Sequence, residues 1–80
     1  MSNPLSYEEY KNRVYEIFKK RCLPFLSEKE KVEYLKKNED VIKDEYKGDL
    51  YEFNNFEGFE TVFDDRSIYS RVCGVLEDLY

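Results

Sequence analysis

The sequence predicts an all-α fold, a small bundle of three to four helices that forms a single domain over residues 1–80. Apolar residues recur at intervals of three and four along three segments, which is the period of an amphipathic helix. Two Ser-x-x-Glu patterns mark helix starts, and no repeat or linker divides the chain. A domain of 80 residues has a small hydrophobic core. The 8 tyrosines and 6 phenylalanines suit such a core because each large ring buries much surface area.

The first helix begins at the capping box Ser6-Tyr7-Glu8-Glu9, in which the Ser6 and Glu9 side chains each accept from the other residue's backbone amide. An apolar stripe follows at helical spacing and contains Tyr7, Tyr10, Val14, Ile17 and Phe18. Pro24 disfavours helical backbone at the residue before it, so we expect the helix to end at Leu23.

A second capping box, Ser27-Glu28-Lys29-Glu30, begins the next helix. Its apolar face contains Val32, Leu35, Ile42, Tyr46, Leu50 and Phe53. This spacing favours one continuous or gently kinked helix to about Phe53, with a polar gap near Asn38. Two alternatives stay open, because a new helix could start at Asn38 and Gly48 could end one.

Residues 54–58 are predicted to form a turn. In an alternative interpretation, residues 50–53 and 59–63 are two strands of a short hairpin around it, since the second run is aromatic and β-branched. The fold would then be α+β, with one short hairpin at 50–63. An isolated hairpin is marginal, so it would have to pack against the helices.

The last helix is predicted to begin at Asp64 and Asp65, whose carboxylates suit an N-cap and the positive end of the helix dipole. Its apolar stripe contains Ile68, Val72, Val75, Leu76 and Leu79. Gly74 lies inside this helix and is expected to let another helix approach closely.

The composition removes most catalytic machinery. Without histidine the chain has no Ser-His or Cys-His pair, and its three glycines form no phosphate-binding loop. Cys22 and Cys73 are too few for a zinc site, and we expect two free buried thiols, with a disulfide as the alternative. We therefore expect no enzyme activity, cofactor or metal site. The chain shows neither an export signal nor a membrane span, which indicates a cytoplasmic protein without a membrane partner.

Charge is divided by position along the chain. Residues 1–37 hold 9 Lys/Arg against 6 Asp/Glu, and residues 38–80 hold 4 against 12. Carboxylates one helical turn apart, such as Asp40 and Asp44, could hold Mg²⁺ or Ca²⁺, but an acidic solvent-facing helix has the same pattern. The basic run Lys19-Lys20-Arg21 is explained by the end of a helix, so we expect no direct contact with nucleic acid.

The acidic segment predicts a surface for a basic partner. On a helix, Glu45, Asp49 and Glu52 form one ridge, and dense carboxylates can imitate a phosphate row in competition for a basic groove. Lys43 and Lys47 fall on the opposite flank, so they are not expected to neutralise the ridge. The candidate partner-binding residues are Glu45, Asp49, Tyr51, Glu52, Glu57, Glu60, Asp64 and Asp65.

Small, acidic, tyrosine-rich chains without motifs resemble the accessory proteins of phages and mobile elements, including anti-restriction and anti-CRISPR inhibitors. The resemblance is one of size and charge, and it carries over no functional residue. We expect a non-catalytic interaction module that regulates or inhibits a basic, nucleic-acid-binding partner. The alternative is a structural or assembly subunit that forms a homo-oligomer, and the sequence leaves the oligomeric state open.

Overall fold

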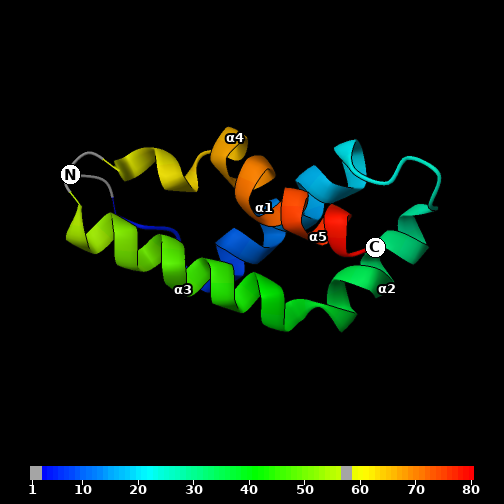
Figure 1. The fold of residues 1–80 in the computed structure, drawn as a ribbon, viewed down its shortest axis with the longest axis horizontal. Helices are drawn as coiled ribbons and strands as arrows, with labels where there is room; N and C mark the ends of the chain where they lie inside the picture. The colour runs from blue at the N-terminus through cyan, green and yellow to red at the C-terminus, as the bar shows by residue number, and fades with distance from the viewer. Residues whose placement is uncertain (1–2, 57–58) are drawn as a thin grey trace.

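The computed structural model describes residues 3–56 and 59–80 and has an all-α fold, as predicted (Figure 1). Three helices come first: α1 (Tyr7–Arg21), α2 (Glu28–Lys37) and α3 (Glu39–Asn55). A 3-10 helix, η1 (Phe59–Phe63), leads into a continuous helical segment made of α4 (Asp65–Ile68), the π-helix η2 (Tyr69–Cys73) and α5 (Gly74–Leu79).

The hairpin alternative at 50–63 is wrong, because no described residue forms a strand and residues 50–55 continue α3. Leu50 and Phe53 both pack against the core, as helical spacing places them on one face. The Phe53 ring meets the buried Phe63 ring of η1 at 5.5 Å between centroids. The segment Phe59–Phe63 therefore packs onto α3 as a 3-10 helix.

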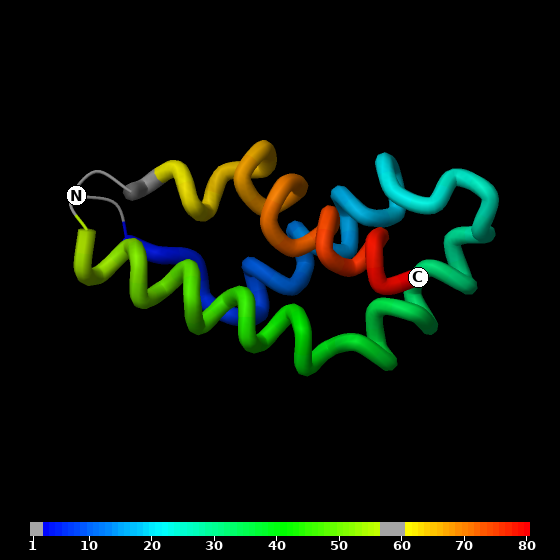
Figure 2. The backbone as a smooth tube through the Cα atoms, viewed as in Figure 1, coloured from blue at the N-terminus to red at the C-terminus, as the bar shows by residue number. Residues whose placement is uncertain are grey.

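The long elements lie side by side along an elongated body of 39 × 20 × 20 Å. Figure 2 shows that α1 runs toward one end of the molecule, α3 returns in the opposite direction, and the segment 65–79 runs in the direction of α1 again. The helix α2 closes the end at which α1 finishes, and η2 contacts both α1 and α3.

The predicted helix starts are confirmed. The Glu9 backbone N–H donates to Ser6 Oγ at 3.2 Å, and the Ser6 N–H donates to Glu9 Oε1 at 3.3 Å. Ser27 and Glu30 form the same reciprocal pair. At the last helix, the Ser67 N–H donates to Asp64 Oδ1 at 2.8 Å. Each cap satisfies a donor that lacks a partner within the helix.

The helix ends at Lys37 and a new helix begins at Glu39, on either side of Asn38. The prediction of one continuous or gently kinked helix is therefore wrong, and the alternative of a new helix is correct. Asn38 has φ −112° and ψ 27°, and its Nδ2 donates to the Tyr34 carbonyl at 2.9 Å. The two helices diverge sharply there, yet both Leu35 and Ile42 are buried. Gly48 does not end α3, which continues to Asn55.

The helix α1 ends at Arg21, close to the predicted position before Pro24. Leu23 has a φ of 47°, the left-handed region that costs a branched side chain about 1–2 kcal/mol. Two contacts hold it there: its side chain is buried, and its N–H donates to Glu77 Oε2 at 3.1 Å. The link between α1 and α2 is therefore tied to α5.

The π-helix η2 changes the register of the last helix. Ile68, Val72 and Leu76 are buried as predicted, but Val75 is 38% exposed and Leu79 is 59% exposed, which corrects the expected stripe. A π turn contains about one more residue than an α turn, so the positions after it rotate. Cys73 accordingly faces the core. The prediction for Gly74 is also wrong, because a Cβ there would meet only the Tyr69 carbonyl oxygen, at 3.7 Å.

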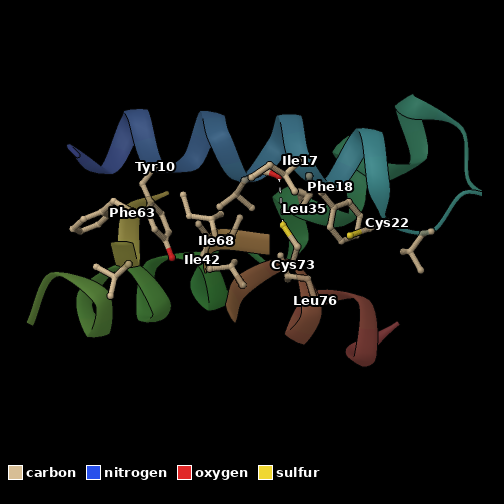
Figure 3. Packing of buried hydrophobic residues seen from close by; sticks show 14 residues of the cluster. Tyr10, Ile17, Phe18, Cys22, Leu35, Ile42, Phe63, Ile68, Cys73 and Leu76 are labelled. Carbon is tan, nitrogen blue, oxygen red and sulfur yellow. Dashed lines mark hydrogen bonds between the residues drawn. The ribbon is translucent and has the colours of Figure 1, made fainter. Parts of the chain in front are cut away.

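The core lies between α1 and the other elements (Figure 3). All predicted apolar positions of α1 from Tyr10 to Phe18 are buried. Cys22 and Cys73 are also buried, and both are free thiols, as expected. The Cys73 Sγ donates to the Val14 carbonyl at 3.9 Å, and burial raises the pKa of this thiol to about 12.

Candidate partner-binding surface

Asp49 does not lie on the surface that the sequence predicts. Its side chain is 1% exposed, because α3 turns this position toward α1 and η2. The Tyr10 hydroxyl donates to Asp49 Oδ2 at 2.8 Å, and Arg71 Nη1 donates to Oδ1 at 2.8 Å. Asp49 therefore joins three elements and offers no contact to a partner, which removes it from the predicted set.

Arg71 also binds Glu52, with 2.7 Å between its Nη1 and Glu52 Oε2. Arg71 therefore neutralises Asp49 and Glu52, a pairing that the sequence does not predict. The cation comes from η2, and the predicted lysine positions on α3 do not supply it. Hydrogen bonding to Glu52 raises the pKa of Arg71, which keeps its charge.

Glu45 lies close enough to Asp49 and Arg71 to be affected by both charges, but no ion pair joins it to Arg71 among the described residues. Burial and the nearby Asp49 raise the pKa of Glu45, while Arg71 opposes the shift. Burial likewise raises the pKa of Asp49, although Tyr10 and Arg71 stabilise its ionised form. Both shifts arise mainly because the two carboxylates are partly removed from water, and the neighbouring negative charges add to them.

The burial of Asp49 has a signal in the sequence. Ile42, Tyr46, Asp49 and Phe53 follow one another at steps of 4, 3 and 4, so Asp49 stands at a core position of an apolar stripe. A charged residue there needs a buried partner. The sequence does not identify that partner, because Arg71 lies 22 positions away on another helix.

The remaining predicted residues do not form one cluster. Tyr51 is 62% exposed, and its ring meets that of Phe56 at 6.4 Å. Asp64 is exposed but serves as the N-cap of α4. Asp65 is exposed and pairs with Arg13 at 3.3 Å. Glu57 lies outside the described residues, and so does the side chain of Glu60.

Among the exposed and half-exposed side chains of α3, four form what we call the acidic face: Asp44, Glu45, Tyr51 and Glu52, the last of which is paired with Arg71. Their spacing of one and two turns places them on adjacent strips of the helix, around the exposed Gly48. A Cβ at Gly48 would meet nothing within 4 Å, so the middle of this face is open. The sequence leaves Asp44 as either a metal ligand or a solvent-facing charge, and the structure adds it to this surface.

The described residues contain no group of three or more Cys, Asp or Glu side chains suited to a metal ion. Near Asp49 and Glu52 the Arg71 guanidinium already takes the place that a cation would need. Among the same residues, no helix is long and apolar enough to cross a membrane.

Comparison of the chain with protein-family models, with curated proteins and with solved structures gives no match. Function is therefore argued from the residues of this chain alone.

Proposed function

We propose that this protein acts without catalysis, by binding the basic surface of another protein through the acidic face of α3. The observation that carries the proposal is the excess of carboxylates near Arg71, which binds Asp49 and Glu52 and has Glu45 close by. Asp44 adds a further exposed negative charge, and Tyr51 adds an exposed ring, the kind of side chain that is enriched in interfaces.

The charge density of the acidic face limits what it can imitate. From Asp44 to Glu52 the helix rises about 12 Å, over which duplex DNA carries about 7 charges. The face presents Asp44, Glu45 and Glu52 over that length, and Glu52 is paired with Arg71. It therefore suits competition for a small basic patch on a nucleic-acid-binding protein rather than replacement of a whole duplex. A phage or mobile-element inhibitor of such a partner remains the biological role we propose.

The test uses affinity capture from the host with two baits of equal charge. In the first, Asp44→Asn, Glu45→Gln and Glu52→Gln neutralise the acidic face. In the control, Glu8→Gln, Glu16→Gln and Asp78→Asn remove the same charge from exposed positions elsewhere. We expect a basic protein to be retained by the wild type and the control, lost by the first bait, and released by salt. Equal retention by both baits would contradict the proposal.

A second function, assembly into a homo-oligomer, is favoured by a different observation. At the end of the molecule near the C-terminus, Phe25 is 69% exposed, and Leu79 and Tyr80 are each 59% exposed. Phe25 and Tyr80 are in contact, with ring centroids 5.7 Å apart, so this apolar surface is continuous. Exposed apolar patches of this kind mark interaction surfaces.

Sedimentation equilibrium separates the two functions. Self-association through this end predicts a mass above 9.8 kDa that returns to the monomer value in Phe25→Ser and Leu79→Ser variants. A monomeric wild type at high protein concentration would eliminate the second function and leave the first unaffected.

A further inference from the structure

A pocket of about 200 Å³ opens between α2 and the end of α5. Six residues line it: Leu26, Glu30, Glu33, Tyr34, Lys37 and Tyr80. A water molecule takes about 30 Å³ in the liquid, so the pocket has room for the end of a long side chain. In Figure 1 the C-terminus lies beside α2, at the opposite end of the molecule from the last turn of α3.

The aromatic wall of this pocket is held in place. The Tyr34 hydroxyl donates to the Leu76 carbonyl at 2.5 Å, and its ring stacks on the buried Phe18 ring with centroids 5.9 Å apart. The Tyr80 ring then meets Tyr34 edge-on at 5.4 Å. Because Tyr34 is fixed by both its hydroxyl and its ring, it forms a rigid wall that exists before any ligand binds.

The charges around the pocket favour a cation. Hydrogen bonds from Ser27 lower the pKa of Glu30 and keep it ionised. Glu33 is exposed and forms no ion pair within the described part of the chain. Lys37 lies one turn after Glu33 and competes for it. Among the residues that line the pocket, two carboxylates outnumber one ammonium beside the tyrosine rings, whose faces also attract cations.

We propose that this pocket binds an arginine side chain of the basic partner. The planar guanidinium stacks on an aromatic face and donates two parallel hydrogen bonds to a carboxylate, whereas an ammonium does not. Tyr80 and Glu33 supply these two contacts, and Leu26 packs against the methylene stem. The inference rests on the proposed function only for the origin of the arginine, because binding of the side chain itself is tested without the partner.

The test is a titration of the ¹⁵N-labelled protein with N-acetyl-arginine N-methylamide, followed by NMR. We expect saturable shifts of the backbone amides of Leu26, Glu33 and Tyr34, with a dissociation constant near ~1 mM, because few contacts are made. The citrulline analogue has nearly the same shape without the charge, and it is expected to bind at least several-fold more weakly. Equal binding of citrulline, equal binding of the lysine analogue, or shifts that never saturate would overturn the proposal.

Three exposed substitutions then locate the contacts. Glu33→Gln and Tyr80→Ala are each expected to weaken arginine binding about two- to five-fold, as is usual for exposed ion pairs and cation–π contacts. Lys37→Gln removes the competing ammonium and is expected to strengthen binding. An unchanged NMR spectrum away from the pocket establishes that each variant is folded. Unchanged affinity in both Glu33→Gln and Tyr80→Ala would overturn the assignment.

The acidic-face variant keeps the two proposals distinguishable. Asp44→Asn, Glu45→Gln and Glu52→Gln lie outside the pocket and are expected to leave arginine binding unchanged. Loss of partner capture in that variant with normal arginine titration supports both proposals. Normal partner capture by that variant contradicts the proposed function while the arginine result stands.

Discussion

Around Tyr10 the core contains a buried carboxylate, whereas around Phe18, two turns later on the same helix, the buried side chains are apolar except for Lys31. Lys31 donates to the Lys19 carbonyl at 2.8 Å, and Figure 3 shows the apolar side chains of both regions. In the first region, which we call the polar half, Asp49 binds Tyr10 and Arg71. In the second, the apolar half, Phe18 is buried together with Leu35, Leu76 and the two cysteines. The helix α1 contributes to both.

The two halves stabilise the fold in different ways: the apolar half by the surface area it buries, and the polar half by the orientation that its hydrogen bonds require. Hydrophobic burial is non-directional, so the apolar half stabilises close approach of the helices without selecting one register. The Asp49 carboxylate accepts hydrogen bonds from two particular donors, and only one rotation of the last helix brings Arg71 to it. We infer that the polar half selects the π-helical register of η2, in which Arg71 reaches α3.

One of the two largest expected effects comes from removing the charge of the polar half. Asp49→Ala leaves the buried Tyr10 hydroxyl without its acceptor and is expected to lower the free energy of unfolding by about 3 kcal/mol. The loss stays at the low end of the range for buried pairs because Arg71 keeps Glu52. Urea denaturation followed by circular dichroism measures it.

Two further variants sharpen that result. Phe18→Ala in the apolar half is expected to cost about 3–5 kcal/mol through the cavity it leaves. The double variant Asp49→Leu, Arg71→Leu is expected to recover part of the loss of Asp49→Ala, because leucine fills the space that alanine leaves and no half-buried cation stays beside it. The Tyr10 hydroxyl still lacks its acceptor, so the recovery is partial. A double variant no more stable than Asp49→Ala would show that the polar half contributes stability as well as register.

Alkaline pH tests both halves separately. Burial raises the pKa of Cys73 to about 12, and burial together with the Asp49 hydrogen bond raises the pKa of Tyr10 above its usual range. These groups stay protonated in the native state after they ionise in the unfolded chain. Stability is therefore full below about pH 8.5 and is lost as pH rises, by up to about 1.4 kcal/mol per pH unit for each group.

Substitutions assign the alkaline loss to each region. Cys73→Ala is expected to reduce the part that starts near pH 9, where Cys22 also contributes, in urea midpoints measured across the range. Tyr10→Phe is expected to reduce the part that starts near pH 10, where Tyr7, Tyr15 and Tyr34 also contribute. If both variants follow the wild-type profile above pH 9, neither group is responsible and the two burial assignments fail.

The helix caps provide a smaller and more uniform comparison. Ser6 caps α1 beside the polar half, and Ser27 caps α2 beside the apolar half, with the same reciprocal hydrogen bonds. Ser6→Ala and Ser27→Ala are each expected to lower the free energy of unfolding by about 1 kcal/mol. Thermal unfolding measures both, and Ser→Gly at the same positions is the control because glycine costs only a few tenths. If the loss of unfolding free energy at one site exceeded the loss at the other by clearly more than about 1 kcal/mol, the two halves would not be unfolding as one unit.

The smallest effect is a gain in stability. Gly48→Ala adds a methyl group that meets nothing within 4 Å, in a helix where alanine is favoured over glycine. We expect an increase of about 0.5–1 kcal/mol in the free energy of unfolding, measured by urea denaturation. A loss of stability would show that the acidic face is not open at its centre.

The sequence by itself determined the local features. Each capping box joins residues three positions apart, and the stripe of α1 depends only on helical period, so neither requires the rest of the fold. Both were predicted correctly from the residues, as was the all-α class. The three-residue range of these hydrogen bonds is the physical reason.

Only the tertiary structure decided the break at Asn38, the π register of the last helix and the burial of Asp49. The last two depend on contacts between distant segments: Tyr10 and Asp49 are 39 positions apart, and Asp49 and Arg71 are 22 apart. A carboxylate can face water or a buried cation at the same place in a helical pattern. Which of the two it faces depends on whether packing brings a donor within hydrogen-bond distance. The local sequence pattern does not contain that information.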